Sequence, residues 1–161
     1  MSQDLDLPSF PVYRASLVVE SNFLQRQGLL QELRATRLFE VVIDAKSLRH
    51  GVEVLRNNAV DICVVGPTVE PAHASTFLTC AKHFSRNKDC AYLKMLAEET
   101  AAASALPIDA LAVDGFVPRG LTKRKLSDSL VRAVRKANER VEQLKAKYAS
   151  GQVLKLSYGV E

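Results

Sequence analysis

The chain has no tryptophan, three cysteines among its 161 residues, and no uncharged apolar run near the roughly 20 residues that a membrane-spanning helix needs. Cys63, Cys80 and Cys90 form no CxxC pair, which argues against a disulfide framework or a zinc site. The acidic N-terminus, Met1 to Asp6, lacks the basic and apolar regions of a signal peptide. We therefore expect a cytoplasmic protein that does not enter a membrane.

Motifs for common chemistry are also missing. The sequence contains no GxGxxG or GxxxxGK(S/T) loop for nucleotides and no GxSxG turn for a serine nucleophile. His50, His73 and His83 have no acid or cysteine at ligand spacing, and we interpret them as surface residues. The sequence therefore predicts no metal site.

Length and composition indicate one compact domain. Apolar residues make up 47% of the chain, enough for an ordinary core. Residues 1–11 contain two prolines and no periodicity, so we expect a flexible tail there. We place the domain at 12–136, and a helical extension with a C-terminal arm at 137–161.

The positive charge is unevenly distributed. From Arg119 to Lys147 there are ten lysines and arginines against three acids, whereas the rest of the chain is slightly acidic. The simplest interpretation is a solvated helix face. The alternative is a surface for an acidic partner or for nucleic acid.

Short apolar segments alternate with helical patterns throughout the chain. Such alternation predicts βαβ units with right-handed crossovers and a parallel sheet covered on both faces. Five repeats fit an α/β, flavodoxin-like, doubly wound sheet of strand order 2-1-3-4-5. The predicted strands are 12–19, 39–43, 62–65, 90–96 and 116–118. The predicted helices follow Ser21 or Asn22 and Ser47, and span 72–85, 98–106 and 122–148.

Three segments resemble parts of a response-regulator receiver domain. Residues 17–21 (LVVES) resemble the first strand and its acidic pair, 61–66 (DICVVG) resemble the strand that carries the phosphoacceptor, and 114–120 (DGFVPRG) resemble the last strand and its lysine. The resemblance covers about Tyr13 to Lys136. It implies the same fold and a role in two-component signal transduction.

The resemblance also implies which parts of the receiver site are lost. Receivers use two carboxylates for Mg²⁺, an acceptor aspartate, a hydroxyl on strand four and a lysine on strand five. Here Glu20 keeps one acid and Ser21 replaces the other. Gly66 stands at the acceptor, Ala97 at the hydroxyl and Arg119 at the lysine. We expect no catalytic residue, metal or cofactor, a Glu20–Arg119 ion pair across an empty site, and a protein that is not an enzyme.

Other acids near this site are poor substitutes for the aspartate. Asp61 begins its strand and therefore belongs at the opposite edge of the sheet, and Asp44 ends a different strand. Glu70, on the loop after Gly66, is the remaining candidate, but we do not favour it.

The last predicted helix carries a narrow apolar seam with steps of three and four residues, which is typical of helix association. It extends about three turns past Lys136. We expect self-association, as a homodimer, through this extension. The alternative is that the extra turns fold back on the domain. The self-association residues are Ala137, Val141, Leu144 and Tyr148.

The leading hypothesis is a pseudo-receiver, a signalling or scaffold module that binds a protein partner without being phosphorylated. A nucleic-acid-associated regulator that uses the basic last helix is one alternative. A small-ligand sensor on the same scaffold is another. The predicted partner-binding residues are Phe116, Arg119, Leu126, Leu130 and Val134.

Overall fold

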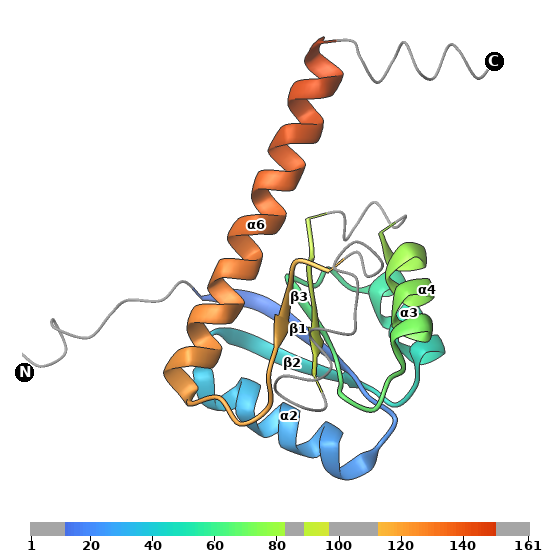
Figure 1. Ribbon diagram of the computed structural model, residues 1–161, viewed down its shortest axis with the longest axis vertical. Helices are drawn as coiled ribbons and strands as arrows, with labels where there is room; N and C mark the ends of the chain where they lie inside the picture. Colours follow the sequence, from blue (N-terminus) through green and yellow to red (C-terminus); the bar gives the residue numbers. More distant parts are fainter. Residues whose placement is uncertain (1–11, 83–88, 97–112, 151–161) are drawn as a thin grey trace, which may run out of the picture.

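The computed structural model describes residues 12–82, 89–96 and 113–150 (Figure 1). The predicted tail at 1–11, the helix at 98–106 and the C-terminal arm lie outside these residues. The elements in chain order are β1 (Tyr13–Val19), α2 (Phe23–Thr36), β2 (Phe39–Ala45), α3 (Leu48–Asn57), β3 (Ile62–Val65), α4 (Pro71–Ala81), β4 (Ala91–Met95), β5 (Gly115–Val117) and α6 (Lys123–Ser150).

The strands form one parallel sheet of order β2-β1-β3-β4-β5, which confirms the predicted topology. The central strand β3 is buried along its whole length, as expected for a parallel strand covered on both faces. Cys63 lies within it and is a core residue. The edge strand β2 is partly exposed.

Helices cover both faces of the sheet, α3 and α4 on one side and α2 and α6 on the other (Figure 1). Alternate residues of each strand point to opposite faces. Leu17 and Val19 of β1 therefore pack with the α3/α4 core, whereas Val18 packs with the α2/α6 core. This two-sided burial holds the carboxyl ends of β1 and β3 side by side.

Short polar side chains begin the helices where the sequence predicts them. The Asn22 side chain accepts a hydrogen bond from the backbone N–H of Gln25 at 3.0 Å, and Ser47 accepts one from His50 at 3.0 Å. Of the two predicted caps for α2, the structure uses Asn22.

The last helix, α6, runs for 28 residues and rises beyond the sheet (Figure 1). Its first turns pack on the domain through Leu126, Leu130, Ala133 and Ala137, all of which are buried. No helix within the described residues is long and apolar enough to cross a membrane.

Candidate functional site

Glu20 and Gly66 meet at the carboxyl edge of the sheet. They directly follow β1 and β3, whose last residues are paired in register, and the N–H of Gly66 donates to the carbonyl of Val19 at 2.8 Å. The sequence predicted this juxtaposition correctly, because parallel strands end at the same edge.

The Glu20 side chain occupies the space that a side chain at position 66 would need. A Cβ atom on Gly66 would lie 2.8 Å from both Cβ and Cδ of Glu20, closer than such atoms approach in proteins. Glu20 itself is fully buried. Position 66 therefore carries no side chain, and the space that one would need is filled by a neighbouring acid.

The Glu20 carboxylate is satisfied by protein groups. Oε2 accepts from the backbone N–H of Asn22 at 2.8 Å, and Oε1 accepts from the backbone N–H of Thr68 at 2.9 Å. The Thr68 hydroxyl donates to Oε2 as well. Hydrogen bonds to an ionised carboxylate are about twice as strong as neutral ones. They hold the loop after β3 against the turn after β1.

Lys94 supplies a cation that the sequence analysis missed. It lies on β4 opposite Val65 of β3, and only 3% of its surface is exposed. Its Nζ donates to the carbonyl oxygens of Gly66 and Met95, both at 2.8 Å. Burial lowers the pKa of Lys94 to about 8, and the Glu20 carboxylate opposes this shift. A lysine inside an otherwise apolar strand was the available signal.

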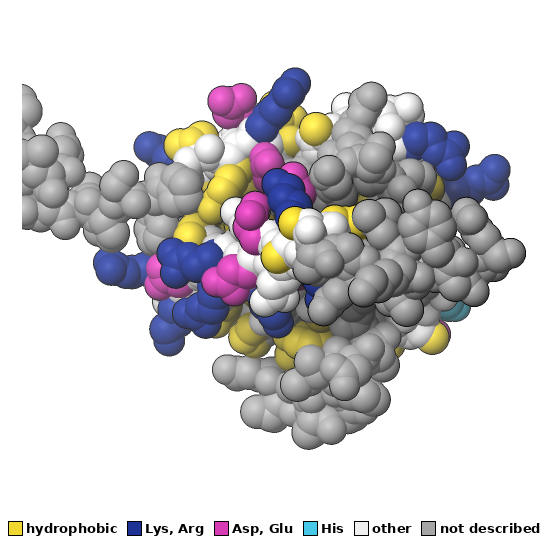
Figure 2. Space-filling view, turned by 90° about the horizontal axis from the view of Figure 1, so that it is seen from above, with side chains coloured by type: hydrophobic (Ala, Val, Ile, Leu, Met, Phe, Trp, Pro, Cys, Tyr) yellow, Lys and Arg dark blue, Asp and Glu magenta, His cyan; other side chains and the backbone are white. Residues whose placement is uncertain are grey.

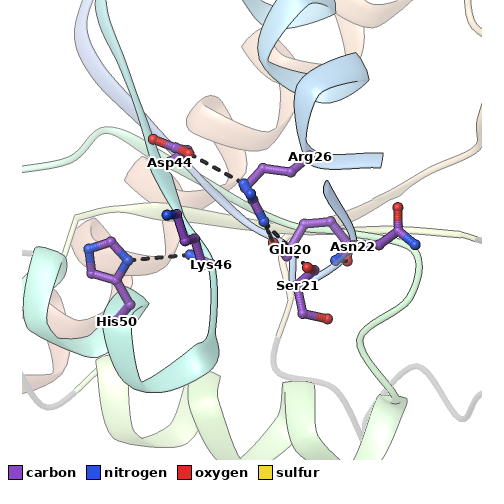
Figure 3. Close-up of polar contacts among 7 residues, drawn as sticks. All are labelled: Glu20, Ser21, Asn22, Arg26, Asp44, Lys46 and His50. Carbon is purple, nitrogen blue, oxygen red and sulfur yellow. Dashed lines mark hydrogen bonds and ion pairs between the residues drawn. The ribbon is translucent and has the colours of Figure 1, made fainter. Parts of the chain in front are cut away.

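Arg26 of α2 holds the turn that follows β1 (Figure 3). Its Nη1 donates to the carbonyl of Glu20 at 2.9 Å, and its Nε lies 3.3 Å from Oδ2 of Asp44. That Nε has no hydrogen-bond partner, so the Asp44 contact is one of charge and not of aligned N–H and oxygen. The guanidinium also lies over the Phe23 ring, 5.7 Å from its centre. Asp44 is therefore engaged outside the Glu20 pocket.

The predicted ion pair between Glu20 and Arg119 is wrong. Glu20 turns toward Asn22 and Thr68, whereas Arg119 is exposed on the loop after β5 and contributes to a separate cavity. Ser21 is exposed. Ala97 lies outside the described residues. The Glu20 side chain fills the space next to Gly66, and a cavity of about 340 Å³ lined by Ser21, Thr68 and Glu70 lies at the same edge of the sheet.

The other acids lie where the sequence placed them. Asp61 accepts from the N–H groups of Arg14 and Ala15 at the amino edge of the sheet. The side chain of Glu70 is 74% exposed, at the start of α4. Asp61 is therefore at the far edge of the sheet from Glu20, whereas Glu70 lines a cavity with Ser21 and Thr68 and lies 4.0 Å from His73.

Two of the predicted partner-binding residues are core residues. Leu126 is 4% exposed and Leu130 is fully buried, because the α6 seam packs on the sheet over this stretch. Phe116 and Val134 are half-buried, and both pack at the edges of the core clusters. Of the predicted set, only Arg119 is exposed.

The predicted self-association seam also divides in two. Ala137 is fully buried within the domain, which corrects its assignment to a free surface. Arg140 still contacts the domain through Asp114 and the carbonyl of Cys90. Beyond it, Leu144 and Tyr148 are about half exposed. The open part of the seam therefore begins after Arg140, one turn later than predicted.

The residues at this edge do not fit the Mg²⁺ that a receiver-like site implies. Magnesium prefers several oxygen ligands from carboxylates and water. Both oxygens of the Glu20 carboxylate are engaged, Gly66 has no side chain, and Lys94 adds a positive charge nearby. Glu70, at the neighbouring cavity, is largely exposed. Within the described ranges, no three His, Cys, Asp or Glu residues are grouped to hold a metal ion.

No family model matches the sequence, and no curated protein sequence matches it. The fold nevertheless resembles solved receiver domains. The chemotaxis protein CheY4 of Vibrio cholerae is 16% identical, with a TM-score of 0.61 over 76% of this chain and 99% of that chain. The receiver domain of a sensor histidine kinase of Pseudomonas aeruginosa, solved with magnesium in its active-site cleft, is 13% identical, with a TM-score of 0.59 over 75% and 97%.

A third solved structure, a trimeric coiled coil of yeast Spc42 fused to another structure, is 17% identical, with a TM-score of 0.64 over 93% of this chain and 99% of that chain. At these identities the comparisons show a CheY-like receiver fold.

Proposed function

We propose that the chain is a pseudo-receiver: a non-enzymatic signalling or scaffold module that binds a protein partner without being phosphorylated. The observation that supports this proposal best is the placement of Glu20 over Gly66. The acceptor position has no nucleophile, and the space for one is filled by a carboxylate whose oxygens are already hydrogen-bonded.

The same contacts support a module that rests in one state. In a phosphorylated receiver, the phosphoryl group provides the ligand that a hydroxyl and a lysine then bind. Here the positions of that hydroxyl and that lysine hold Ala97 and Arg119. The nearby Thr68 hydroxyl already donates to Glu20, and Lys94 donates to backbone carbonyls. A switch needs a ligand that binds two states with different affinity. In this module a partner must supply that difference.

Intact mass spectrometry tests the first part of the proposal. We expect no phosphoryl adduct after the full chain is incubated with acetyl phosphate and Mg²⁺, while a receiver domain that carries the acceptor aspartate is modified in parallel. An adduct mapped to Glu20, Thr68 or Glu70 would contradict phosphorylation independence.

The partner surface includes the outer side of α6 near the domain. This face is rich in cations, and a protein partner with an acidic surface would complement it. Arg119, on the loop that precedes α6, is also exposed. The exposed basic residues of the face are Arg124, Lys125, Arg132, Arg135 and Lys136.

Self-association would proceed through the open part of the α6 seam. Leu144 is 46% exposed and Tyr148 is 55% exposed, and they continue the stripe that buries Leu130 and Ala137 lower on the same helix. Isolated helical turns are marginal in water unless their apolar stripe is packed. The fused coiled-coil structure covers 93% of this chain, more than the two receivers do. This extra coverage supports a second copy as the partner of the seam.

Sedimentation equilibrium of the full chain tests the self-association. The double variant Leu144→Ser/Tyr148→Ser should shift the dimer toward monomer. It should leave the part of α6 from Lys123 to Arg140 helical. A matched control, Lys145→Ser, changes an exposed residue outside the seam and should leave the mass unchanged. A wild-type chain that is monomeric at high concentration would contradict the idea.

Nucleic acid is a second candidate partner for the same cations. Binding would weaken steeply with salt, because each phosphate contact releases a counterion. Figure 2 shows lysine and arginine interleaved with acidic side chains on the face seen from above. On the basic face of α6 itself, the exposed acid Asp128 lies one turn from both Arg124 and Arg132. We therefore favour a protein partner, and a salt titration with short DNA and RNA duplexes distinguishes the two.

A further inference from the structure

A second cavity lies at the same edge of the sheet, on the side of α2 and α6. Its volume is about 560 Å³, within the roughly 300–1,000 Å³ of small-molecule sites. It lies between α2 and the loop that joins β5 to α6, and its lining includes neither Glu20 nor Gly66. Ligands of open α/β sheets bind beyond the carboxyl ends of the strands, which is where this cavity opens.

The cavity combines an apolar floor with a charged rim. Leu29 of α2 and Met95 at the end of β4 are each 4% exposed and form the floor, while Leu24, 77% exposed, stands beside the opening. The rim carries the carboxylate of Glu32 and the guanidinium of Arg119, both exposed. Such a lining suits a ligand with an apolar body and charged ends.

The two rim charges lie near each other without forming an ion pair. Burial raises the pKa of Glu32, and the nearby Arg119 guanidinium acts to lower it. Among the described residues, no ion pair within 4.0 Å joins them. The carboxylate of Glu32 and the guanidinium of Arg119 are therefore both available to a ligand that carries one positive and one negative group.

Gly28 is an independent sign that the cavity is kept open. It lies in the middle of α2, where glycine is one of the least favourable residues for a helix. A Cβ atom built on it meets no atom within 4 Å, so packing does not require glycine here. Gly28 nevertheless lines the cavity. Its bare backbone leaves room that a side chain would take.

We propose that this cavity binds a small zwitterion with an apolar side chain, the chemistry of an apolar α-amino acid. The ligand carboxylate pairs with Arg119, and its side chain packs on Leu29 and Met95. Its ammonium group pairs with Glu32 and with the amide carbonyl oxygen of Gln25, which also lines the cavity. The inference is separate from the pseudo-receiver proposal, with which it shares only Arg119.

Isothermal titration calorimetry and backbone amide NMR on the full chain test the ligand class. L-leucine, L-methionine and L-phenylalanine should bind and shift the amide signals of Gly28 and Gly120. Leucinamide, which lacks the carboxylate, and 4-methylpentanoate, which lacks the ammonium group, should bind about tenfold more weakly or worse. Glycine, which lacks the side chain, should not bind. Equal binding of 4-methylpentanoate, or no binding of any amino acid at millimolar concentration, would overturn the proposal.

Variants test the site itself. Gly28→Leu should abolish binding while melting at the same or a higher temperature, because leucine favours the helix and here enters open space. Gln27→Leu places the same side chain on an exposed position of α2 and should bind like the wild type. Arg119→Gln and Glu32→Gln should each weaken binding about tenfold. Unchanged binding by Gly28→Leu or by Arg119→Gln would refute the assignment, whatever the acetyl phosphate experiment shows.

Discussion

Replacing Gly66 by alanine should destabilise this protein, the opposite of what the substitution usually does at such a backbone conformation. Gly66 is not in the left-handed region. A glycine of this kind normally gains about 0.4–1 kcal/mol on replacement by alanine, because the unfolded chain loses freedom. Here the new methyl group would lie 2.8 Å from Cβ and Cδ of Glu20. Overpacking of that kind costs about 1–3 kcal/mol.

A double-mutant cycle with Glu20→Ala isolates this contact. Glu20→Ala alone should cost about 2–4 kcal/mol, because it removes the hydrogen bonds to Asn22 and Thr68. It also removes Oε1 and Cδ of Glu20, two of the three atoms that would obstruct a Cβ at position 66, and leaves the Cβ of residue 20. Gly66→Ala should then cost less in the Glu20→Ala background than in the wild type, so the coupling free energy should exceed about 0.5 kcal/mol.

Urea unfolding, followed by far-UV circular dichroism near neutral pH, measures all four corners of the cycle. Gly28→Ala is the matched control: its new methyl group meets no atom, and it should stabilise the protein by up to about 1 kcal/mol. A stabilised Gly66→Ala variant, or costs that add to within about 0.5 kcal/mol, would refute the claim that Glu20 fills the space beside Gly66.

Further measurements probe other contacts. Because the pKa of Lys94 is about 8 in the folded chain and 10.5 ordinarily, the unfolded chain holds its proton more tightly between these values. The unfolding free energy of the wild type, relative to Lys94→Met, should therefore rise by about 2 kcal/mol from about pH 7 to about pH 9.5. If the difference in unfolding free energy between wild type and Lys94→Met does not change with pH in urea titrations, the lowered pKa of Lys94 is wrong. Arg140→Ala should cost about 2 kcal/mol in thermal or urea unfolding, since it leaves the buried carboxylate of Asp114 without its cation. Lys145→Ala removes only the exposed ion pair with Glu142 and should change the unfolding free energy by less than about 0.5 kcal/mol. Equal losses of stability in the two variants would contradict a stabilising Arg140–Asp114 ion pair. A thiol reagent should modify Cys80 in the folded protein and the two other cysteines only after unfolding, because those two are buried. Rapid reaction of all three would contradict the packing of β3 and β4.

Much of the architecture was predictable because it depends on local patterns. The run Ile62 to Val65 is continuously apolar, so it had to be a strand with both faces covered. Asn22 and Ser47 precede helical apolar stripes and do start those helices. Given the βαβ order, the carboxyl ends of β1 and β3 must meet, which places Glu20 next to Gly66.

Side-chain direction was not predictable in the same way. Position alone suggested that Glu20 would reach across to Arg119, but the nearby backbone N–H groups of Asn22 and Thr68 provide closer donors. The sequence places Lys94 in a short apolar strand but does not show which groups its ammonium meets. Its Nζ finds two carbonyl oxygens only when β3 and β4 are paired. The apolar spacing of α6 is the same along the whole helix, so the sequence could not show at which residue the helix stops packing on the domain.

By itself, the sequence determined the strand order and the absence of a carboxylate at position 66, since both follow from residue types and their spacing along one chain. Only the tertiary structure decided that the Glu20 side chain fills the space beside Gly66, that Lys94 donates to the Gly66 carbonyl, and that a cavity opens beside Gly28. The physical reason is that these features depend on which hydrogen-bond partners and which empty space each side chain meets, and the groups concerned lie on segments far apart in the sequence.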